Sequence, residues 1–191
     1  RGKEIIFPAF TFPVIPMVAR LLGYKPVFCD VDPESFNAGA EHIEAKITEN
    51  TGAVLATHMF GRPCPIREIA ELVKSRGIRL LEDCAQAIGA SLKGRPSGSY
   101  GDIGIYSFQL NKNMTCGEGG LVITNNRPLY DRAFSEHDMG MVRVAGRLAM
   151  PRAGAVMWGE GRRMTEVCGA IACEQLRKLP AIVAKRRRLA A

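Results

Sequence analysis

Short apolar runs alternate with amphipathic segments along most of this chain. A continuous apolar run predicts a strand that is buried on both faces of a sheet, whereas apolar residues three or four positions apart predict one face of a helix. We therefore expect strands at residues 4–7, 26–31, 53–57, 78–83, 103–108 and 121–124, and helices at 13–22, 39–47, 65–77, 128–136 and 163–179. This alternation predicts an α/β fold with a mostly parallel sheet covered on both faces.

Two features interrupt the pattern. Residues 137–161 have no clean period and are rich in Gly, Met and Arg, so we predict one long loop, and loops of such length are usually functional or mobile. Pro180 follows a helical segment and should interrupt or kink it. The chain of 191 residues starts at Arg1, without an initiator Met, and a strand is expected from Glu4. We therefore interpret residues 1–191 as a single domain cut from a longer protein.

Composition narrows the choice of partners. The net charge is +7, and the run 185–188 supplies four of the positive charges. Because a short charge run is usually the solvated face of a helix, we do not expect nucleic acid as a partner. The longest uncharged stretch, 5–19, contains three prolines and is too short to span a membrane. None of the six cysteines forms a C-x-x-C pair, which argues against a zinc site and favours reduced thiols in a cytoplasmic protein.

The candidate chemistry gathers in the middle of the chain. Asp83 ends one predicted strand and Gln86 follows it, whereas Ser107 lies near the end of the next strand, five residues before Lys112. Open α/β sheets bind ligands at the carboxyl ends of their strands, so these groups can converge. A lysine, a carboxylate and a hydroxyl suit pyridoxal phosphate: the amine forms a Schiff base, the carboxylate pairs with the pyridine nitrogen and the hydroxyl binds the phosphate. Phe12 is a candidate for stacking on the ring.

Taken singly, each of these residues would be an ordinary cap or a solvated side chain, but their order is specific. Five segments resemble motifs of the DegT/StrS family of pyridoxal-phosphate-dependent sugar aminotransferases, and the resemblance runs from about residue 4 to about residue 188. It implies the large domain of a fold type I enzyme, a three-layer sandwich around a mostly parallel mixed sheet, without the upstream phosphate loop and the C-terminal small domain. The five segments are residues 7–12, 82–87, 98–102, 107–112 and 117–120.

The resemblance implies a role for each candidate. Lys112 would be the Schiff-base lysine, and Asp83 would pair with the pyridine nitrogen. Gln86 would contact the side of the ring that carries the hydroxyl. Ser107 would hold the phosphate, and Phe12 would stack on the ring.

The resemblance also implies a reaction and a partner. An amino group would pass from glutamate or glutamine to a keto-sugar, usually nucleotide-linked, in amino-sugar, polysaccharide or antibiotic biosynthesis, with Lys112 as general base and then acid. The protein would be a homodimer with shared active sites. Gly161 is a departure, because the family usually has there an Asn that reaches the partner subunit's cofactor phosphate. Arg143, Arg147 and Arg152 are candidates for the diphosphate, and are equally well explained as surface charge.

Several alternatives remain open at this point. The acceptor can be an inosose instead of a sugar nucleotide, and the sequence does not separate the two. A sugar dehydratase of the family typically has histidine in place of Lys112, and a non-catalytic regulatory protein has no need of both Lys112 and Asp83. A nicotinamide-dependent reductase is disfavoured because the glycines at 117–120 do not form a G-x-G-x-x-G turn after the first strand.

Overall fold

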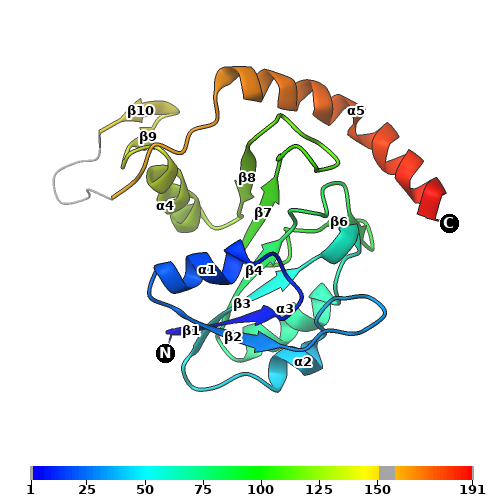
Figure 1. Ribbon diagram of the computed structural model, residues 1–191. Helices are drawn as coiled ribbons and strands as arrows, with labels where there is room; N and C mark the ends of the chain where they lie inside the picture. The colour runs from blue at the N-terminus through cyan, green and yellow to red at the C-terminus, as the bar shows by residue number, and fades with distance from the viewer. Residues whose placement is uncertain (1, 151–157, 191) are drawn as a thin grey trace.

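A computed structural model describes residues 2–150 and 158–190. Six strands form the central sheet in the order β2-β1-β3-β4-β7-β8 (Figure 1). The first five in that order are parallel to their neighbours, and β8 runs antiparallel to β7, which confirms the predicted mostly parallel mixed sheet. The strands are β1 (Glu4–Pro8), β2 (Lys25–Cys29), β3 (Thr51–Thr57), β4 (Arg79–Asp83), β7 (Ile103–Ser107) and β8 (Gly120–Ile123).

Helices cover both faces of this sheet, because the strand residues alternate between two apolar layers. On one face α2 (Ala40–Glu44) and α3 (Ile66–Ser75) bury the larger core, in which Ile69 is fully enclosed and packs with Leu80 of β4. On the other face α1 (Val14–Leu21) packs through Ala19 on Phe7 and Leu55. The α/β class predicted from the apolar pattern is therefore confirmed.

The last helix fixes the turn that follows β7. In Figure 1, α5 (Glu166–Ala190) runs along one end of the sheet. Phe108, Met114 and Cys116 are buried in a small cluster with Ala172 of this helix. The turn between them carries Lys112, so its backbone is anchored at both ends by apolar contacts.

The segment predicted as one long loop is partly ordered into secondary structure, so that prediction was wrong. Helix α4 (Arg127–His137) ends inside it, and β9 (Val142–Val144) pairs with β10 (Arg147–Ala149) as a hairpin. Gly161 forms an antiparallel bridge with Asp138. Strands of three residues are too short to show an alternating pattern, which explains why no periodicity indicated them. Residues 151–157 of the segment lie outside the described part.

A second short hairpin occupies the loop predicted before β7, formed by β5 (Ser91–Leu92) and β6 (Arg95–Pro96). Of the two outcomes expected at Pro180, an interruption or a kink, the interruption was wrong, because α5 continues through this residue. Proline removes a backbone hydrogen bond to the residue four positions earlier. That residue, Leu176, and Pro180 itself are both exposed, so water can reach the freed carbonyl group.

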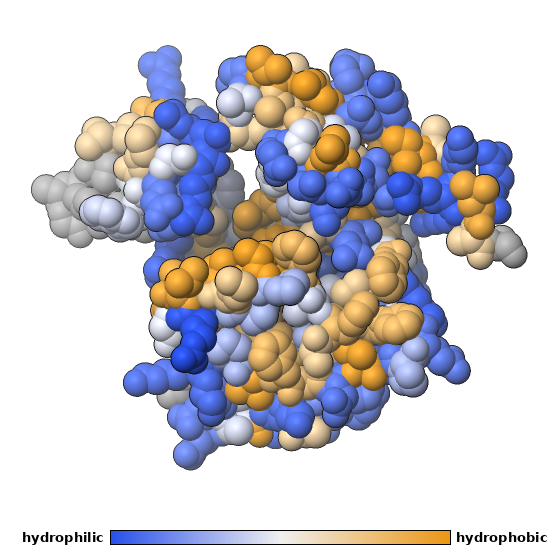
Figure 2. Space-filling view, viewed as in Figure 1, coloured by the Kyte–Doolittle hydropathy of each residue, from blue (hydrophilic) through white to orange (hydrophobic). Residues whose placement is uncertain are grey.

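Part of the described surface over α1 is apolar. Figure 2 shows hydrophobic side chains gathered over α1, where Met17, Leu21 and Leu22 are exposed. Among the helices in residues 2–150 and 158–190, none has the length and apolar character needed to cross a membrane.

Candidate functional site

The strand register brings Asp83 and Ser107 to one edge and one face of the sheet. Asp83 is the last residue of β4 and pairs with Ile105 of β7. Side chains two residues apart on a strand share a face, so Ser107, the last residue of β7, lies on the same face one step further. Thr57 of β3 also pairs with Asp83, and its hydroxyl lies 3.3 Å from the hydroxyl of Thr11. This contact places the segment that carries Phe12 beside the same edge.

Asp83 is a buried carboxylate with few neighbouring groups that stabilise its negative charge. It is 4% exposed, and its Oδ1 accepts a hydrogen bond of 2.9 Å from the backbone N–H of Ala85. No described residue donates to Oδ2. Burial raises the pKa of Asp83 above its ordinary value, although the Ala85 hydrogen bond and the positive charge of Lys112 oppose the shift. The structure therefore has an acid whose charge would be stabilised by a further cationic or hydrogen-bonding group.

The neighbouring acid, Glu82, points to the opposite face and is fully buried but well satisfied. Its Oε1 accepts from the backbone N–H groups of Tyr100 and Gly101, both at 2.6 Å, and its Oε2 accepts from the N–H of Gly98 at 2.7 Å. His58 Nε2 lies 3.0 Å from the same Oε2. Burial alone would raise the pKa of Glu82, but the hydrogen bonds from His58, Gly101 and Gly98 hold that pKa below its ordinary value.

His58 has a defined tautomer in this arrangement. Its Nδ1 lies 3.1 Å from the backbone nitrogen of Cys64, which can only donate. Nδ1 is therefore the acceptor, and the proton is on Nε2, where it is donated to Glu82. The backbone N–H of His58 donates to the carbonyl of Asp83 at 3.0 Å. His58 thus joins the loop after β3 to both acids at the end of β4.

His58, Glu82 and Cys84 offer ligand atoms that all lie within 4.8 Å of one another, a spacing that a metal ion would accept. Their donor atoms are already occupied, however, because both His58 nitrogens and both Glu82 oxygens have hydrogen-bond partners in the protein. Burial, followed by the charge of Glu82, raises the pKa of the Cys84 thiol well above its ordinary value, so the thiolate that a metal needs is disfavoured. The cluster is a structural network.

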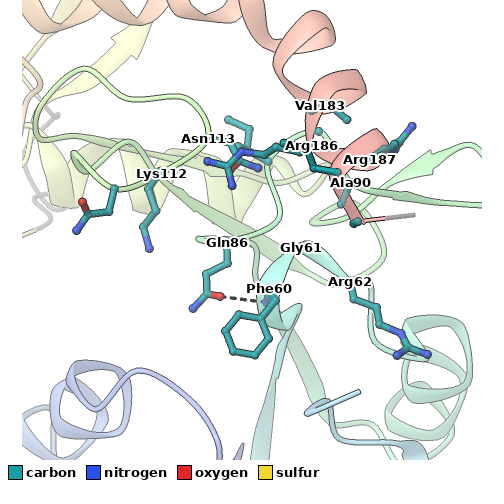
Figure 3. Close-up of a pocket in the computed structure, with 15 residues that line it drawn as sticks. Phe60, Gly61, Arg62, Gln86, Ala90, Lys112, Asn113, Val183, Arg186 and Arg187 are labelled. Carbon is teal, nitrogen blue, oxygen red and sulfur yellow. Dashed lines mark hydrogen bonds between the residues drawn. The ribbon is translucent and has the colours of Figure 1, made fainter. Parts of the chain in front are cut away.

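Lys112 and Gln86 line one open cavity of about 830 Å³. Figure 3 shows both side chains extending toward the side on which Phe60 lies. The Gln86 Oε1 accepts a hydrogen bond of 3.0 Å from the backbone N–H of Phe60, which fixes the amide so that its NH₂ group remains to donate elsewhere. The backbone N–H of Lys112 donates to the carbonyl of Gln109 at 2.9 Å, closing the turn that presents the amine.

Ser107 and Phe12 do not line the cavity that contains Lys112. The Ser107 hydroxyl accepts a hydrogen bond of 3.3 Å from the backbone N–H of Gln109, so it caps the turn before Lys112. Phe12 is 66% exposed. Asp83 does not line that cavity either, but it ends β4 next to β7, and the charge of Lys112 acts on its carboxyl group. No other aromatic ring of the described residues stacks on Phe12.

The arginines considered for a diphosphate lie elsewhere. Arg143 donates to the carbonyl of Gly146 and its guanidinium lies 5.0 Å from the centre of the Phe134 ring, so it serves the β9–β10 hairpin. Arg147 lies in β10, and Arg152 is outside the described residues. The cations that line the cavity with Lys112 come from other segments, namely Arg62, Arg186 and Arg187.

The mostly parallel mixed α/β sheet is that of the pyridoxal-phosphate-dependent fold type I class. Within that class the chain belongs to the DegT/DnrJ/EryC1/StrS aminotransferase family, whose sequence model matches residues 1–191. The family uses pyridoxal phosphate.

Individual relatives agree with this assignment. GDP-perosamine synthase of Escherichia coli O157:H7 is 37% identical over 193 residues, which cover 99% of this chain and 50% of that protein. The structure of an aminotransferase from Streptoalloteichus hindustanus matches with a TM-score of 0.89 at 34% identity, over 99% of this chain and 50% of that one. DesI, solved in the presence of its TDP-sugar product, matches with a TM-score of 0.85 at 32% identity, over 97% and 45%. The chain thus spans about half the length of the curated relative.

Sequence reasoning did not find Glu82, His58 or the cavity arginines. Glu82 had a usable signal, because a carboxylate inside an apolar strand must have buried partners. His58 and Arg62 lie in a loop that has no period, and their roles depend on contacts made across the sheet. Arg186 and Arg187 belong to the charge run, which is an exposed helix face as predicted, and they also line the cavity.

The burial of Asp83 yields a prediction for stability. A carboxyl group whose pKa is raised by folding contributes stability at low pH that is lost as the pH rises through its folded pKa. The substitution Asp83→Asn would keep an acceptor for the Ala85 N–H but carry no charge. At neutral pH and without cofactor, this variant should therefore have a larger free energy of unfolding than the wild type, and the difference should vanish below the ordinary value of 3.8. Urea denaturation across this range measures it, and a variant that is less stable than the wild type at neutral pH contradicts the prediction.

Proposed function

We propose that this chain is the cofactor-binding part of a pyridoxal-phosphate-dependent aminotransferase that acts on a keto-sugar. The observation that carries the proposal is the buried Asp83 carboxylate, which lacks a full countercharge and feels the charge of Lys112. A pyridinium nitrogen is a cation of suitable shape that also donates a hydrogen bond. Family membership supports the same conclusion.

The donor set fits the cofactor residue by residue. The Oδ2 of Asp83 can accept the pyridine N–H, and this pairing would lower the pKa of that carboxyl group. The Gln86 NH₂ group can donate to an oxygen on the ring, because its Oε1 is held by the N–H of Phe60. The Ser107 hydroxyl retains its proton for a phosphate oxygen while its own oxygen accepts from Gln109. Phe12 offers an exposed ring for stacking.

When bound, pyridoxal phosphate supplies an aldehyde that reacts with primary amines and a ring that accepts electrons. In the chain itself, Lys112 then has two tasks: its amine holds the aldehyde at rest, and during transfer it removes and returns a proton. Asp83 keeps the pyridine nitrogen protonated, an electrostatic contribution whose loss typically raises a barrier by about 3 kcal/mol. The anchored turn between Phe108 and Met114 keeps the amine in reach.

The substrates are proposed from the relatives. Glutamate or glutamine is the amino donor, and the acceptor is a nucleotide-linked keto-sugar, since one relative is a GDP-perosamine synthase and another was solved with a TDP-sugar product. The open cavity beside Lys112 has room for a large acceptor and is lined by three arginines. The product would enter amino-sugar, polysaccharide or antibiotic biosynthesis.

The assignment of Lys112 can be tested by trapping. The intact protein, loaded with pyridoxal phosphate and treated with borohydride, should carry the reduced cofactor on the peptide that contains Lys112. Lys112→Arg keeps the charge but cannot form the bond, so it should lose the label and at least about 10²-fold of turnover, the usual lower limit for a general acid–base group. Lys93→Arg, in the exposed turn of the β5–β6 hairpin, is the matched control and should behave as wild type. A label on another lysine overturns the assignment.

We also propose that the protein works as a homodimer in which the two subunits complete each other's sites. The candidate contributors are the segment 137–161 and the helix start near Arg162, because both follow Lys112 in sequence. In the described part of that segment Trp158 is 85% accessible. Sedimentation of the intact protein should give a dimer. A monomer with full activity would contradict this proposal while leaving the role of Lys112 intact.

A further inference from the structure

Three phenylalanine rings form an exposed cluster at the carboxyl edge of the sheet. Phe10 follows β1, Phe36 lies in the loop after β2, and Phe60 lies in the loop after β3. Their ring centres are 5.3 Å (Phe10–Phe36), 6.0 Å (Phe10–Phe60) and 5.9 Å (Phe36–Phe60) apart. Each ring is nevertheless exposed, by 43%, 42% and 68% respectively. We call these three residues the aromatic cluster.

Two members of the aromatic cluster have strained backbones. Phe36 has φ of 58° and Phe60 has φ of 55°, the left-handed region that a bulky side chain rarely adopts. Such strain is maintained only where the surrounding structure enforces it, and it concentrates at ligand-binding sites. Within the described residues these side chains stay partly open, so contacts inside this part of the protein do not account for phenylalanine at these positions.

The strained loops are held rigidly to each other. Asn37, which is 2% exposed, accepts from the backbone N–H of Met59 at 2.9 Å and donates to the carbonyl of Arg62 at 3.2 Å. These two hydrogen bonds join the loop of Phe36 to the loop of Phe60. The backbone N–H of Phe36 also donates to the carbonyl of Asp32 at 2.8 Å. The rings are therefore presented in a pre-organised arrangement, which lowers the entropic penalty of binding a ligand.

The aromatic cluster adjoins the candidate active site. Phe60 lines the cavity that also holds Lys112, and its backbone N–H is bound by Gln86 (Figure 3). Arg62, two residues after Phe60, lines the same cavity. Of the aromatic cluster only Phe60 lines this cavity, together with the guanidinium of Arg62 and the amine of Lys112, and the other two rings pack against Phe60. Those three groups match, in kind, the base, the diphosphate and the sugar of a nucleotide-linked sugar.

We propose that the aromatic cluster is the platform on which the nucleobase of the acceptor substrate stacks, with Arg62 facing the diphosphate. The inference rests on the proposed function and adds a binding site to it. Stacking on an aromatic face is tolerant of base identity, because every base has a π-face. The platform therefore recognises that a nucleotide is attached, and it accepts a purine and a pyrimidine alike.

Titration calorimetry of the intact, cofactor-loaded protein tests the proposal. The ligands are GDP, TDP and inorganic pyrophosphate. Phe36→Gly removes one ring, and glycine adopts the left-handed backbone without strain, so the loop should persist. This variant should bind GDP and TDP roughly 5- to 150-fold more weakly, the range for losing one base–aromatic stack. Its affinity for pyrophosphate should not change, because that probe has no base.

Matched variants separate a lost ring from a changed backbone. Phe36→Tyr keeps the ring and should bind as wild type, and so should Lys93→Gly, which relieves a left-handed residue (φ of 50°) in the distant β5–β6 hairpin. Phe10→Ala removes a ring from unstrained backbone and should weaken GDP and TDP binding as Phe36→Gly does.

Three results with the ring-deleted variants would overturn the proposal. These are unchanged GDP and TDP affinity in both variants, equal weakening of pyrophosphate binding, and loss of the dimer, which would make the cluster a subunit interface. Wild type that carries cofactor on Lys112 and aminates a cyclitol ketone but binds neither nucleotide would also overturn it, while leaving the aminotransferase function standing. Failure to trap the cofactor on Lys112 would contradict the function itself.

Discussion

The carboxylate of Glu82 is the contact on which the arrangement of the site depends. It is fully buried and collects hydrogen bonds from three backbone N–H groups of residues 98–101 and from His58. Hydrogen bonds to a charged group contribute about 1.5–3 kcal/mol each, so this carboxylate joins three segments strongly. It ties the end of β4 to the loop that enters β7 and to the loop that leaves β3.

The position of Asp83 follows from that anchor. Successive residues of a strand face opposite sides, so fixing Glu82 toward the α2–α3 layer directs Asp83 to the other face. There the register places it beside β7 and the turn of Lys112. One acid of the pair is saturated by the protein, and the other has an oxygen with no partner among the described residues. The first maintains the fold locally, and the second is the group available for a ligand.

The sequence predicted the parts of this arrangement that are local. Apolar runs predicted the six strands of the main sheet. Asp83 and Ser107 became candidate site residues because they are polar and lie at strand ends. The hydrogen bonds of Glu82 could not be predicted from local patterns, because its partners lie 16 to 24 positions away along the chain. The hairpin within 137–161 was not predicted because three-residue strands show no period. The continuity of α5 through Pro180 depends on the exposure of this part of the helix to water.

The aromatic cluster shows the same limit of local reasoning. Its rings lie in three separate loops, and they meet because β1 is placed between β2 and β3 in the sheet. No local pattern indicates that Phe36 and Phe60 would adopt left-handed backbones. Two hydrogen bonds of Asn37 join these strained loops, so the loops of Phe36 and Phe60 form one pre-organised part of the sheet edge.

We propose that Asp83 is a buried acid whose negative charge is balanced by the pyridinium of a bound cofactor. The most direct test is the pKa of this one carboxyl group, measured by NMR of protein with ¹³C-labelled aspartate, using Asp83→Asn to assign the signal. We predict a pKa above 3.8 in the cofactor-free protein and a pKa well below it after loading with pyridoxal phosphate. An identical pKa in the two forms would show that Asp83 does not pair with the cofactor.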